Sequence, residues 1–399
     1  QYISFWYFIC FYLQLFFSFK ILKKFTNSDL YSFIGSIFFL ITPIFLLRVN
    51  FHAAITGQWI LLLALYLSLA NKVYKSNFQW TLLIIFSPLI NYWFAVFTLS
   101  SYSMLRLFNL KFEKENIFKF IKDFSIIGVF LFIILYIVGY FELRIVDTLG
   151  RGFGYYKFNL LSPFDPVNSI LNFSWSWILP DIKLSEGEEL EGFNYFGLGQ
   201  ILMMLFAFLL FFKESYKTSL QSIKSNKEIK TFFLVSFFFT LWALSNKISF
   251  GSYTLLEISL NKYIFAALSI AKNSGRLFWI VNYFILILSL VIIFKCFNKK
   301  NSILIISLFL IIQLADTSIG IKQRINIFKP VYEAEILKDQ IWDDLFKKYK
   351  IIKTTYPSSW SRLFTRFSYS MEKYNIEKTN IVALGRVNRK SAANARYFL

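Results

Sequence analysis

The sequence predicts an all-α polytopic membrane helix bundle of about ten membrane segments, followed by a small C-terminal α/β domain. The first observation is composition: 56% of the 399 residues are hydrophobic and 21% are aromatic, and the mean hydropathy is +0.53. A soluble core of this length does not hide so much apolar surface. The second is that apolar runs recur throughout residues 2–315, and the third is a polar, basic composition from residue 319 onward.

The expected membrane segments follow the apolar runs, several of which approach the roughly 20 residues that a spanning helix needs. In chain order they are residues 2–19, 30–47, 57–70, 77–87, 89–107, 117–140, 198–212, 231–245, 277–294 and 302–315. Pro88 interrupts one long run, because proline removes a helical hydrogen bond. Two short helices and one kinked helix both fit that interruption, and the placement of charge favours two helices.

The placement of cations predicts the orientation of the bundle. The net charge of +20 would suit nucleic acid, but Lys and Arg gather in alternate connections, which is the positive-inside pattern. We therefore expect a lipid bilayer as partner, no nucleic acid, and a multipass location in the cytoplasmic membrane. The loops 142–197 and 246–275 and the C-terminal residues 319–399 are then extracytoplasmic.

The C-terminal region is expected to be a separate soluble domain that begins after residue 318. Its pattern predicts a strand at 350–356, a helix at 361–374, a second strand at 380–387 and a further helix start at 389–396. It contains neither GxGxxG nor a P-loop, so the sequence does not support a cofactor role there. The preceding loop, 246–275, is predicted to form one or two helices in the membrane interface.

The polar stretch between residues 147 and 199 carries the strongest signs of ligand binding. It holds seven of the 15 glycines and three of the seven prolines, which fix turns and indicate an ordered loop. Seven carboxylates accompany only three cations in an otherwise basic chain. A plain connection between helices needs none of these features, so we expect the loop to bind a ligand.

Several loop residues have chemistry that suits a sugar phosphate. Arg151 and Lys157 are candidates to hold phosphate or pyrophosphate. The residues whose rings and amide suit a sugar are Tyr155, Tyr156, Asn194 and Tyr195. Each also has a plainer interpretation: aromatic residues form interfacial belts beside membranes, and Arg151 can cap Tyr156 or a helix end.

Two loop carboxylates, Asp165 and Glu191, are fallback candidates for a catalytic base. An Asx turn between Pro163 and Pro166 explains Asp165 equally well. A loop carboxylate can also bind a divalent cation. No zinc-type spacing occurs, and no other cofactor is expected.

Three further candidates lie outside this loop. Arg48 and His52 are four residues apart and share one face if the helix continues, where they would contact a phosphate or a carboxylate. Arg276 precedes a strong apolar run and is a third anion contact. The alternatives are arginines that anchor helices at the headgroups and a histidine that caps a helix.

Five segments resemble a family of bacterial multipass proteins described as a domain of unknown function. They are RGFGYYKFNLLSPFDP (151–166), EGFNYFGLG (191–199) and SGRLFW (274–279), of which the first two are fairly specific, and, more loosely, HAAITGQW (52–59) and ALGRVNR (383–389). The family in turn resembles the C-type glycosyltransferases, membrane enzymes that use polyprenyl-phosphate sugar donors. The resemblance implies a hexosyl- or pentosyltransferase that moves a polyprenyl-linked sugar to a glycan or protein acceptor of the envelope on the extracytoplasmic face.

The resemblance also implies where the catalytic residue lies. In such enzymes the catalytic Asp or Glu follows the first helix, in the first outer loop. The chain starts at Gln1 at the edge of an inward-running helix, so we expect that loop to precede the chain, and the chain alone not to catalyse transfer.

Two other function classes remain open. A transporter or flippase of a lipid-linked or small substrate would place ionisable residues in mid-membrane and show repeats; the spans contain little charge and no convincing repeat. A non-catalytic assembly partner would use the C-terminal region to bind another envelope protein.

Overall fold

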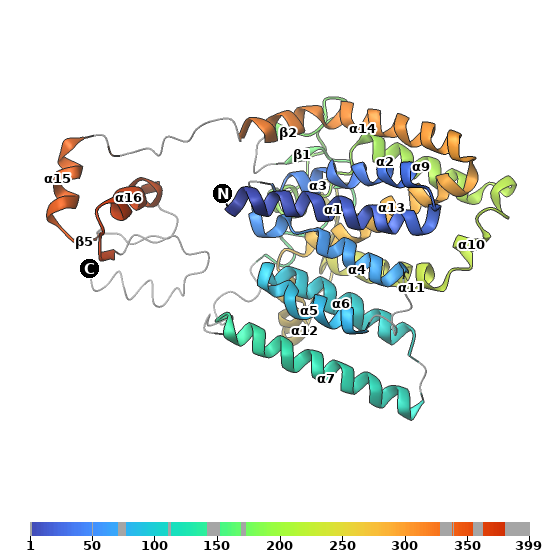
Figure 1. Cartoon of the computed structure of the whole chain (residues 1–399), viewed down its shortest axis with the longest axis horizontal. Helices are drawn as coiled ribbons and strands as arrows, with labels where there is room; N and C mark the ends of the chain where they lie inside the picture. The colour runs from blue at the N-terminus through green and yellow to red at the C-terminus, as the bar shows by residue number, and fades with distance from the viewer. Residues whose placement is uncertain are drawn as a thin grey trace. The chain divides into compact units, whose positions relative to one another are not determined.

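The computed structural model describes residues 2–49, 51–70, 77–110, 113–141, 152–168, 173–327, 337, 339–353 and 362–379. The chain divides into two units, one of residues 1–140 and 150–327 and one of residues 141–149 and 328–399 (Figure 1). The first unit is a helix bundle and contains most of the candidate site residues.

The long helices of the first unit follow the apolar runs. They are α1 (Tyr2–Thr26), α2 (Asp29–Leu40), α4 (Trp59–Ala70), α5 (Asn77–Ile90), α6 (Tyr92–Phe108), α7 (Lys114–Ile137), α9 (Leu198–Phe212), α11 (Lys227–Leu244), α13 (Phe278–Cys296) and α14 (Lys299–Ile327). Asn91 and Asn226 begin α6 and α11, because each side chain accepts a hydrogen bond from a backbone N–H of the first turn.

Short elements connect these helices. The helical ones are α3 (Pro43–Leu46), η1 (Ala53–Thr56), α8 (Glu186–Leu190), η4 (Glu214–Tyr216), α10 (Gln221–Lys224), α12 (Lys262–Leu268), η5 (Ser269–Ala271) and η6 (Ser274–Leu277). Two antiparallel pairs of strands accompany them: β1 (Val167–Asn168) with β2 (Phe173–Ser174), and β3 (Lys247–Phe250) with β4 (Tyr253–Glu257).

Helix α13 forms the centre of the bundle. It is apolar on all sides and buried over most of its length, and it contacts α1, α4, α9, α11 and α14. A helix without a polar face needs apolar neighbours all round. By contrast, α7 lies at the edge of the bundle (Figure 1), where it contacts α5 and leaves large side chains such as Phe118 and Tyr136 about 70% exposed (71% and 69%).

The expected count of about ten membrane segments is wrong. Within the described residues, four helices are long and apolar enough to cross a membrane: Tyr2–Thr26, Lys114–Ile137, Ser274–Cys296 and Lys299–Asn326. Most of the other apolar runs form helices that are too short: the run 198–212 is the 15-residue helix α9, and the run 30–47 is divided because Pro43 starts α3. Four such helices are compatible with a membrane protein. The all-α character is confirmed, because each sheet of the described residues has only two strands.

Two local expectations have clear outcomes. The division at Pro88 into two helices is confirmed, since α5 and α6 pack against each other on either side of Asn91. The interfacial helices expected at 246–275 are in part wrong, because the hairpin β3–β4 precedes the short helix α12. Gly251, at φ +61°, lies between the two strands, where a tight turn favours glycine.

The second unit has a small core of its own. It contains α15 (Gln340–Lys348), β5 (Ile351–Ile352), α16 (Arg362–Lys373) and β6 (Lys378–Thr379), with β5 and β6 parallel. Phe346 and Phe367 pack together in this core. The first strand and the helix agree with the prediction, and an unexpected helix precedes them; β6 lies just before the predicted second strand at 380–387, which is outside the described residues. Helix α14 runs past the expected boundary after residue 318, and the segments 383–389 and 389–396 lie outside the described residues.

Candidate functional site

Three charged residues from distant parts of the first unit meet at one carboxylate. The Nη2 of Arg276 lies 2.6 Å from the Oε1 of Glu191, and its Nε donates to Oε2 at 2.9 Å. The Nη2 of Arg48 lies 2.9 Å from the same Oε2. We call Arg48, Glu191 and Arg276 the arginine cluster. Its geometry exploits the fork of a guanidinium group, which matches a carboxylate with two parallel contacts.

Two glycines bring Glu191 and Arg276 together. A Cβ atom on Gly275 would lie 2.5 Å from the Cα of Gly192, so the two backbones approach more closely than any side chain permits. Asn194 fixes this approach, since its Nδ2 donates to the backbone oxygen of Gly275 at 3.0 Å. The motifs EGFN and SGR thus place their charged residues side by side because their glycines touch.

Arg48 reaches the cluster through a turn after α3. The helix ends at Leu46, so Arg48 and His52 do not share the face of a continuing helix. The backbone N–H of His52 instead donates to the oxygen of Arg48 at 3.0 Å, and Thr56 Oγ1 donates to that oxygen at 3.1 Å. This turn buries Arg48 completely and leaves His52 exposed.

Aromatic rings form the walls around both guanidinium groups. The Cζ of Arg48 lies 5.1 Å from the ring centroid of Trp279, and the Cζ of Arg276 lies 5.4 Å from that of Trp93. Arginine stacks well on such faces and is less strongly hydrated than lysine. The walls therefore exclude water without losing favourable contacts to the cations.

The arginine cluster has more positive than negative charge, and it has unused donors. Two guanidinium groups share one carboxylate, and a third arginine, Arg324 of α14, donates through Nη2 to the backbone oxygen of Val49, next to Arg48. The Nε and Nη1 of Arg48 and the Nε of Arg324 are buried without a hydrogen-bond partner among the described residues. Because buried donors nearly always have partners, these atoms suit an additional anion.

The titration behaviour of the cluster fits binding better than proton transfer. Burial raises the pKa of Glu191, but Arg276 and Arg48 outweigh it and hold that pKa well below its usual range. Partial loss of hydration at the imidazole ring, followed by the charges of Arg276 and Arg48, lowers the pKa of His52. Burial lowers the pKa of Arg48 to about 10. At neutral pH Arg48 is charged, His52 is neutral and Glu191 is a poor base.

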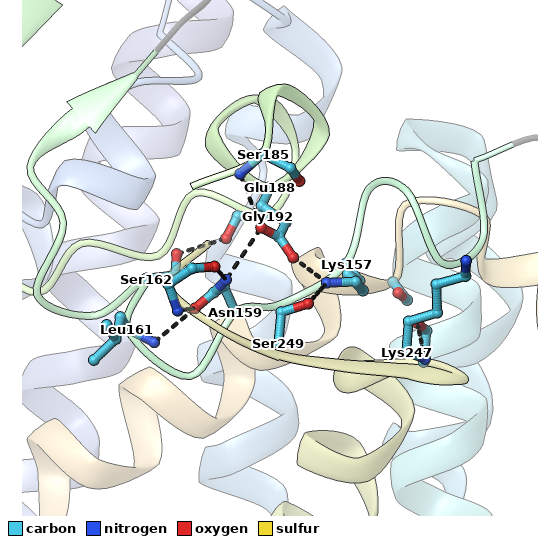
Figure 2. A network of polar contacts seen from close by, with 12 residues as sticks. Lys157, Asn159, Leu161, Ser162, Ser185, Glu188, Gly192, Lys247 and Ser249 are labelled. Carbon is cyan, nitrogen blue, oxygen red and sulfur yellow. Dashed lines mark hydrogen bonds and ion pairs between the residues drawn. The ribbon is translucent and has the colours of Figure 1, made fainter. Parts of the chain in front are cut away.

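A second buried ion pair uses the lysine that was expected to hold phosphate (Figure 2). Lys157 pairs with Glu188 Oε1 and donates to the Oγ of Ser249 at 2.5 Å. The other oxygen of Glu188 accepts from Asn159 Nδ2 at 3.1 Å and from the backbone N–H of Ser185 at 3.0 Å. We call Lys157, Asn159, Glu188 and Ser249 the lysine cluster. It joins the loop, α8 and the hairpin β3–β4, and every charged atom in it has a partner.

The other predicted loop residues fall into different places. Tyr155 is 44% exposed, and its hydroxyl donates to Glu186 at 3.2 Å; the half-buried Tyr156 packs edge-on against it. Tyr195 is fully buried, and its hydroxyl donates to Asp316 Oδ2 at 2.6 Å. Arg151 lies outside the described residues. The structure therefore joins Arg48, Glu191 and Arg276 directly, with His52 and Asn194 beside them, and it places Lys157 and Tyr195 in other contacts.

Asp165 forms the Asx turn that was the alternative to a catalytic role. Its Oδ1 accepts from the backbone N–H of Val167 at 3.2 Å and of Ile182 at 3.3 Å. Its Oδ2 is buried without a hydrogen-bond partner among the described residues, and burial raises its pKa to about 7. No group of three or more metal-ligating side chains occurs in the part of the chain that the structure describes.

Sequence reasoning missed several residues that support these sites. Asp316 of α14 accepts from Tyr195, Ser176 and the backbone N–H of Leu198, and so ties the loop to the bundle. The pattern Ser185-x-x-Glu188 is a capping-box sequence that predicts the start of α8. Trp279 lies in the segment SGRLFW together with Arg276, so the sequence did offer a signal for this residue.

Fold and site together define a helical protein with membrane-compatible helices and a buried, positively charged cluster. The chain belongs to the family described as a domain of unknown function (DUF6311), whose profile matches residues 1–318. This confirms the resemblance to a family of unknown function over that part of the chain; the match carries no likeness to glycosyltransferases. No curated protein and no solved structure matches the chain.

Proposed function

We propose that the arginine cluster binds the phosphate of a lipid-linked sugar and that the protein is an integral-membrane glycosyltransferase. It would move a sugar from a polyprenyl-phosphate donor to an envelope acceptor on the extracytoplasmic face of the bacterial cytoplasmic membrane. The observation that carries the proposal is Arg48, which is fully buried, shares its carboxylate with a second arginine and keeps two donors without partners among the described residues.

The charge of the cluster favours phosphate as the ligand group. Glu191 neutralises one of its two arginines, so a second anion relieves the repulsion between Arg48 and Arg276. Phosphate has several acceptor oxygens in one group, which suits the unused donors of Arg48. Trp93 and Trp279 lower the local exposure to water, and electrostatic attraction is stronger in such surroundings.

The position of the cluster suits a lipid-linked donor. It lies where α3 ends and where α6 and α13 begin, which is one end of the bundle. A phosphate attached to a membrane lipid stands at the ends of spanning helices, while its chain runs along their apolar sides. The cation placement that puts the loop outside the cytoplasm puts this end of the bundle there as well.

Each residue of the site has a separate role in the proposal. Arg48 and Arg276 hold the phosphate, and Glu191 keeps both guanidinium groups in position. His52 is exposed and neutral at neutral pH, so it can exchange hydrogen bonds with a hydroxyl group of the sugar or acceptor. Asn194 acts through the backbone of Gly275 and positions Arg276.

The test measures binding of polyprenyl phosphate to the purified full chain in detergent, with the unphosphorylated polyprenol as reference. Arg48→Gln should weaken binding of the phosphate form at least 30-fold, because a desolvated charged contact is worth about 2–5 kcal/mol. Arg106→Gln is the matched control. Arg106 is also buried, but it pairs with Asp123 near the other end of α6, about 20 Å from Trp93 along the helix.

Two results decide the matter. Equal affinities for the phosphate and the alcohol contradict the phosphate site. If Arg48→Gln and Arg106→Gln lower the melting temperature alike and leave affinity per folded molecule unchanged, Arg48 is structural. Sugar transfer to an envelope acceptor is assayed separately, and binding without transfer by an otherwise complete protein favours a transporter or an assembly partner instead.

A further inference from the structure

An apolar cavity lies at the end of the bundle opposite the arginine cluster. Its volume is about 550 Å³, within the roughly 300–1,000 Å³ of small-molecule pockets. It is lined by the second half of α9, by the middle of α13 and by the first two turns of α11, whereas α9 and α13 begin beside the loop that carries Glu191. Figure 1 shows α10, which also lines it, at the opposite end of the bundle from the start of α1.

The walls of this cavity suit a hydrocarbon chain. Most of the lining side chains are aromatic or aliphatic, and the hydroxyl of Ser289 already donates to the backbone oxygen of Ile285 at 2.9 Å. Phe208, Phe212 and Phe233 line the cavity and are nevertheless 60%, 67% and 61% exposed. The cavity therefore opens between the outward apolar faces of α9 and α11, where a bilayer would place its acyl chains.

Two cations stand at this apolar cavity. Lys224 and Lys230 are the charged residues that line it, and both are exposed. The Nζ of Lys224 lies 4.5 Å from the ring centroid of Phe211, which keeps the ammonium group beside the cavity. Both belong to the segment 213–230, which carries five lysines and two glutamates. The site thus combines a long apolar volume with positive charge at its edge.

We propose that the cavity binds one acyl chain of an anionic phospholipid, whose phosphate contacts Lys224 and Lys230. Snorkelling explains lysines at a membrane surface, but it does not explain a cavity that opens beside them. A neutral lipid would fill the cavity and leave both ammonium groups without an anion. This inference rests on the proposed membrane location and is independent of the arginine cluster, which uses other residues and another ligand.

The test compares phosphatidylglycerol with phosphatidylcholine of the same acyl chains, each bound to the purified full chain and followed by native mass spectrometry. The attraction between one lysine and an anionic headgroup raises the affinity roughly fivefold. Phosphatidylglycerol should therefore bind at least about tenfold more tightly than phosphatidylcholine. The double variant Lys224→Gln/Lys230→Gln should abolish this preference. The matched control is Lys213→Gln/Lys217→Gln, which removes the same charge from the same segment outside the cavity lining.

A second variant tests the apolar part of the site. Ser289→Leu places extra volume in the cavity and should weaken both lipids; Ala207→Val serves the same purpose if the leucine variant does not fold. The proposal is overturned if phosphatidylglycerol keeps its preference in the Lys224/Lys230 variant, or if both charge variants lose it equally. It is also overturned if filling the cavity changes neither affinity, or if free glycerol phosphate competes as well as the lipid.

Discussion

The two buried ion clusters of the first unit contain similar charged groups, but they differ in whether the charges and hydrogen-bond donors are fully paired. In the lysine cluster, one cation meets one carboxylate, and the remaining atoms of both are bonded to Asn159, Ser185 and Ser249. In the arginine cluster, two cations share one carboxylate, and within the described part of the chain Arg48 keeps donors without partners. The first arrangement is complete, and the second has capacity for one more anion.

Under our proposal, this difference is what distinguishes a binding site from a structural ion pair. Burial alone does not distinguish them, because Lys157 and Arg48 are 4% and 0% exposed. Charge type does not either, since the sequence made both residues candidates for phosphate. The distinguishing property is the balance of charges and hydrogen bonds after the protein has made its own contacts, and the following predictions test that balance.

The largest expected effect comes from breaking the complete cluster. Glu188→Gln removes the carboxylate that faces Lys157 and leaves a buried charge without a counter-ion. The expected loss is about 3–5 kcal/mol in the free energy of unfolding. Chemical unfolding in detergent measures it, and phosphate binding per folded molecule should stay unchanged.

The double variant Lys157→Met/Glu188→Gln provides the control. It removes both charges, while glutamine at residue 188 keeps the length of the glutamate side chain and its ability to hydrogen-bond. The double variant should therefore recover most of the lost stability. A double variant as unstable as the single one would contradict the interpretation, because packing rather than charge would then hold this region together.

Asp165 tests how a buried carboxyl group affects stability when one of its oxygens has no hydrogen-bond partner and no cation lies beside it among the described residues. Burial, assisted by Asp181 and Glu189, raises its pKa from 3.8 to about 7 in the folded protein. The folded state therefore retains its proton while the unfolded state releases it, so stability falls as pH rises from about 4 to about 7. At about 1.4 kcal/mol per pKa unit the total is roughly 1–4 kcal/mol.

Asp165→Asn should remove this part of the pH dependence. Thermal unfolding of both proteins across that pH range measures the difference. An unchanged slope in the variant would assign the pH dependence to other groups, and a loss of polyprenyl phosphate binding would place Asp165 in the ligand site instead of its Asx turn.

The smallest expected effect comes from a substitution that disturbs the backbone next to the arginine cluster. Gly275→Ala puts a methyl group 2.5 Å from the Cα of Gly192 and 2.9 Å from the carbonyl carbon of Lys157. We expect a loss of about 1–3 kcal/mol in stability, as for other overpacked positions, and weaker phosphate binding because Glu191 and Arg276 separate.

Gly128→Ala is the matched control for this change, since nothing lies within 4 Å of a Cβ at that position in α7. It should stabilise the helix by up to about 1 kcal/mol and leave binding unchanged. Equal behaviour of the two variants would show that the contact between Gly192 and Gly275 does not shape the site.

The sequence predicted which residues are chemically unusual better than it predicted their partners. Arg48, His52, Glu191 and Arg276 were each candidates on local grounds, and their meeting depends on two glycines far apart in the chain. Lys157 was predicted to contact a ligand, because the sequence does not reveal that Glu188 neutralises it. Only the fold brings these two side chains together. Local pattern gives the type of a side chain, while tertiary packing decides whether its charge is already matched.

The helices show the same limit. Composition predicted an all-α bundle, and Pro88 predicted a division between helices, which the structure places three residues later, at Asn91. The number of spans was overestimated, because apolar length alone does not reveal breaks such as that at Thr42 and Pro43. The hairpin β3–β4 was missed although Gly251-Ser252 between two runs rich in strand-forming residues is a hairpin pattern.

The sharing of one carboxylate by distant arginines also sets the order in which this end of the bundle is completed during synthesis. Arg48 leaves the ribosome long before Glu191, and Arg276 follows only as α13 begins. A buried charge without its partner costs several kcal/mol, so the turn around Arg48 stays accessible to water until the loop arrives. The loop in turn gains its two contacts to a guanidinium group only from Arg276 in η6, the turn directly before α13. The helix at the centre of the bundle is therefore also the one whose insertion closes the site.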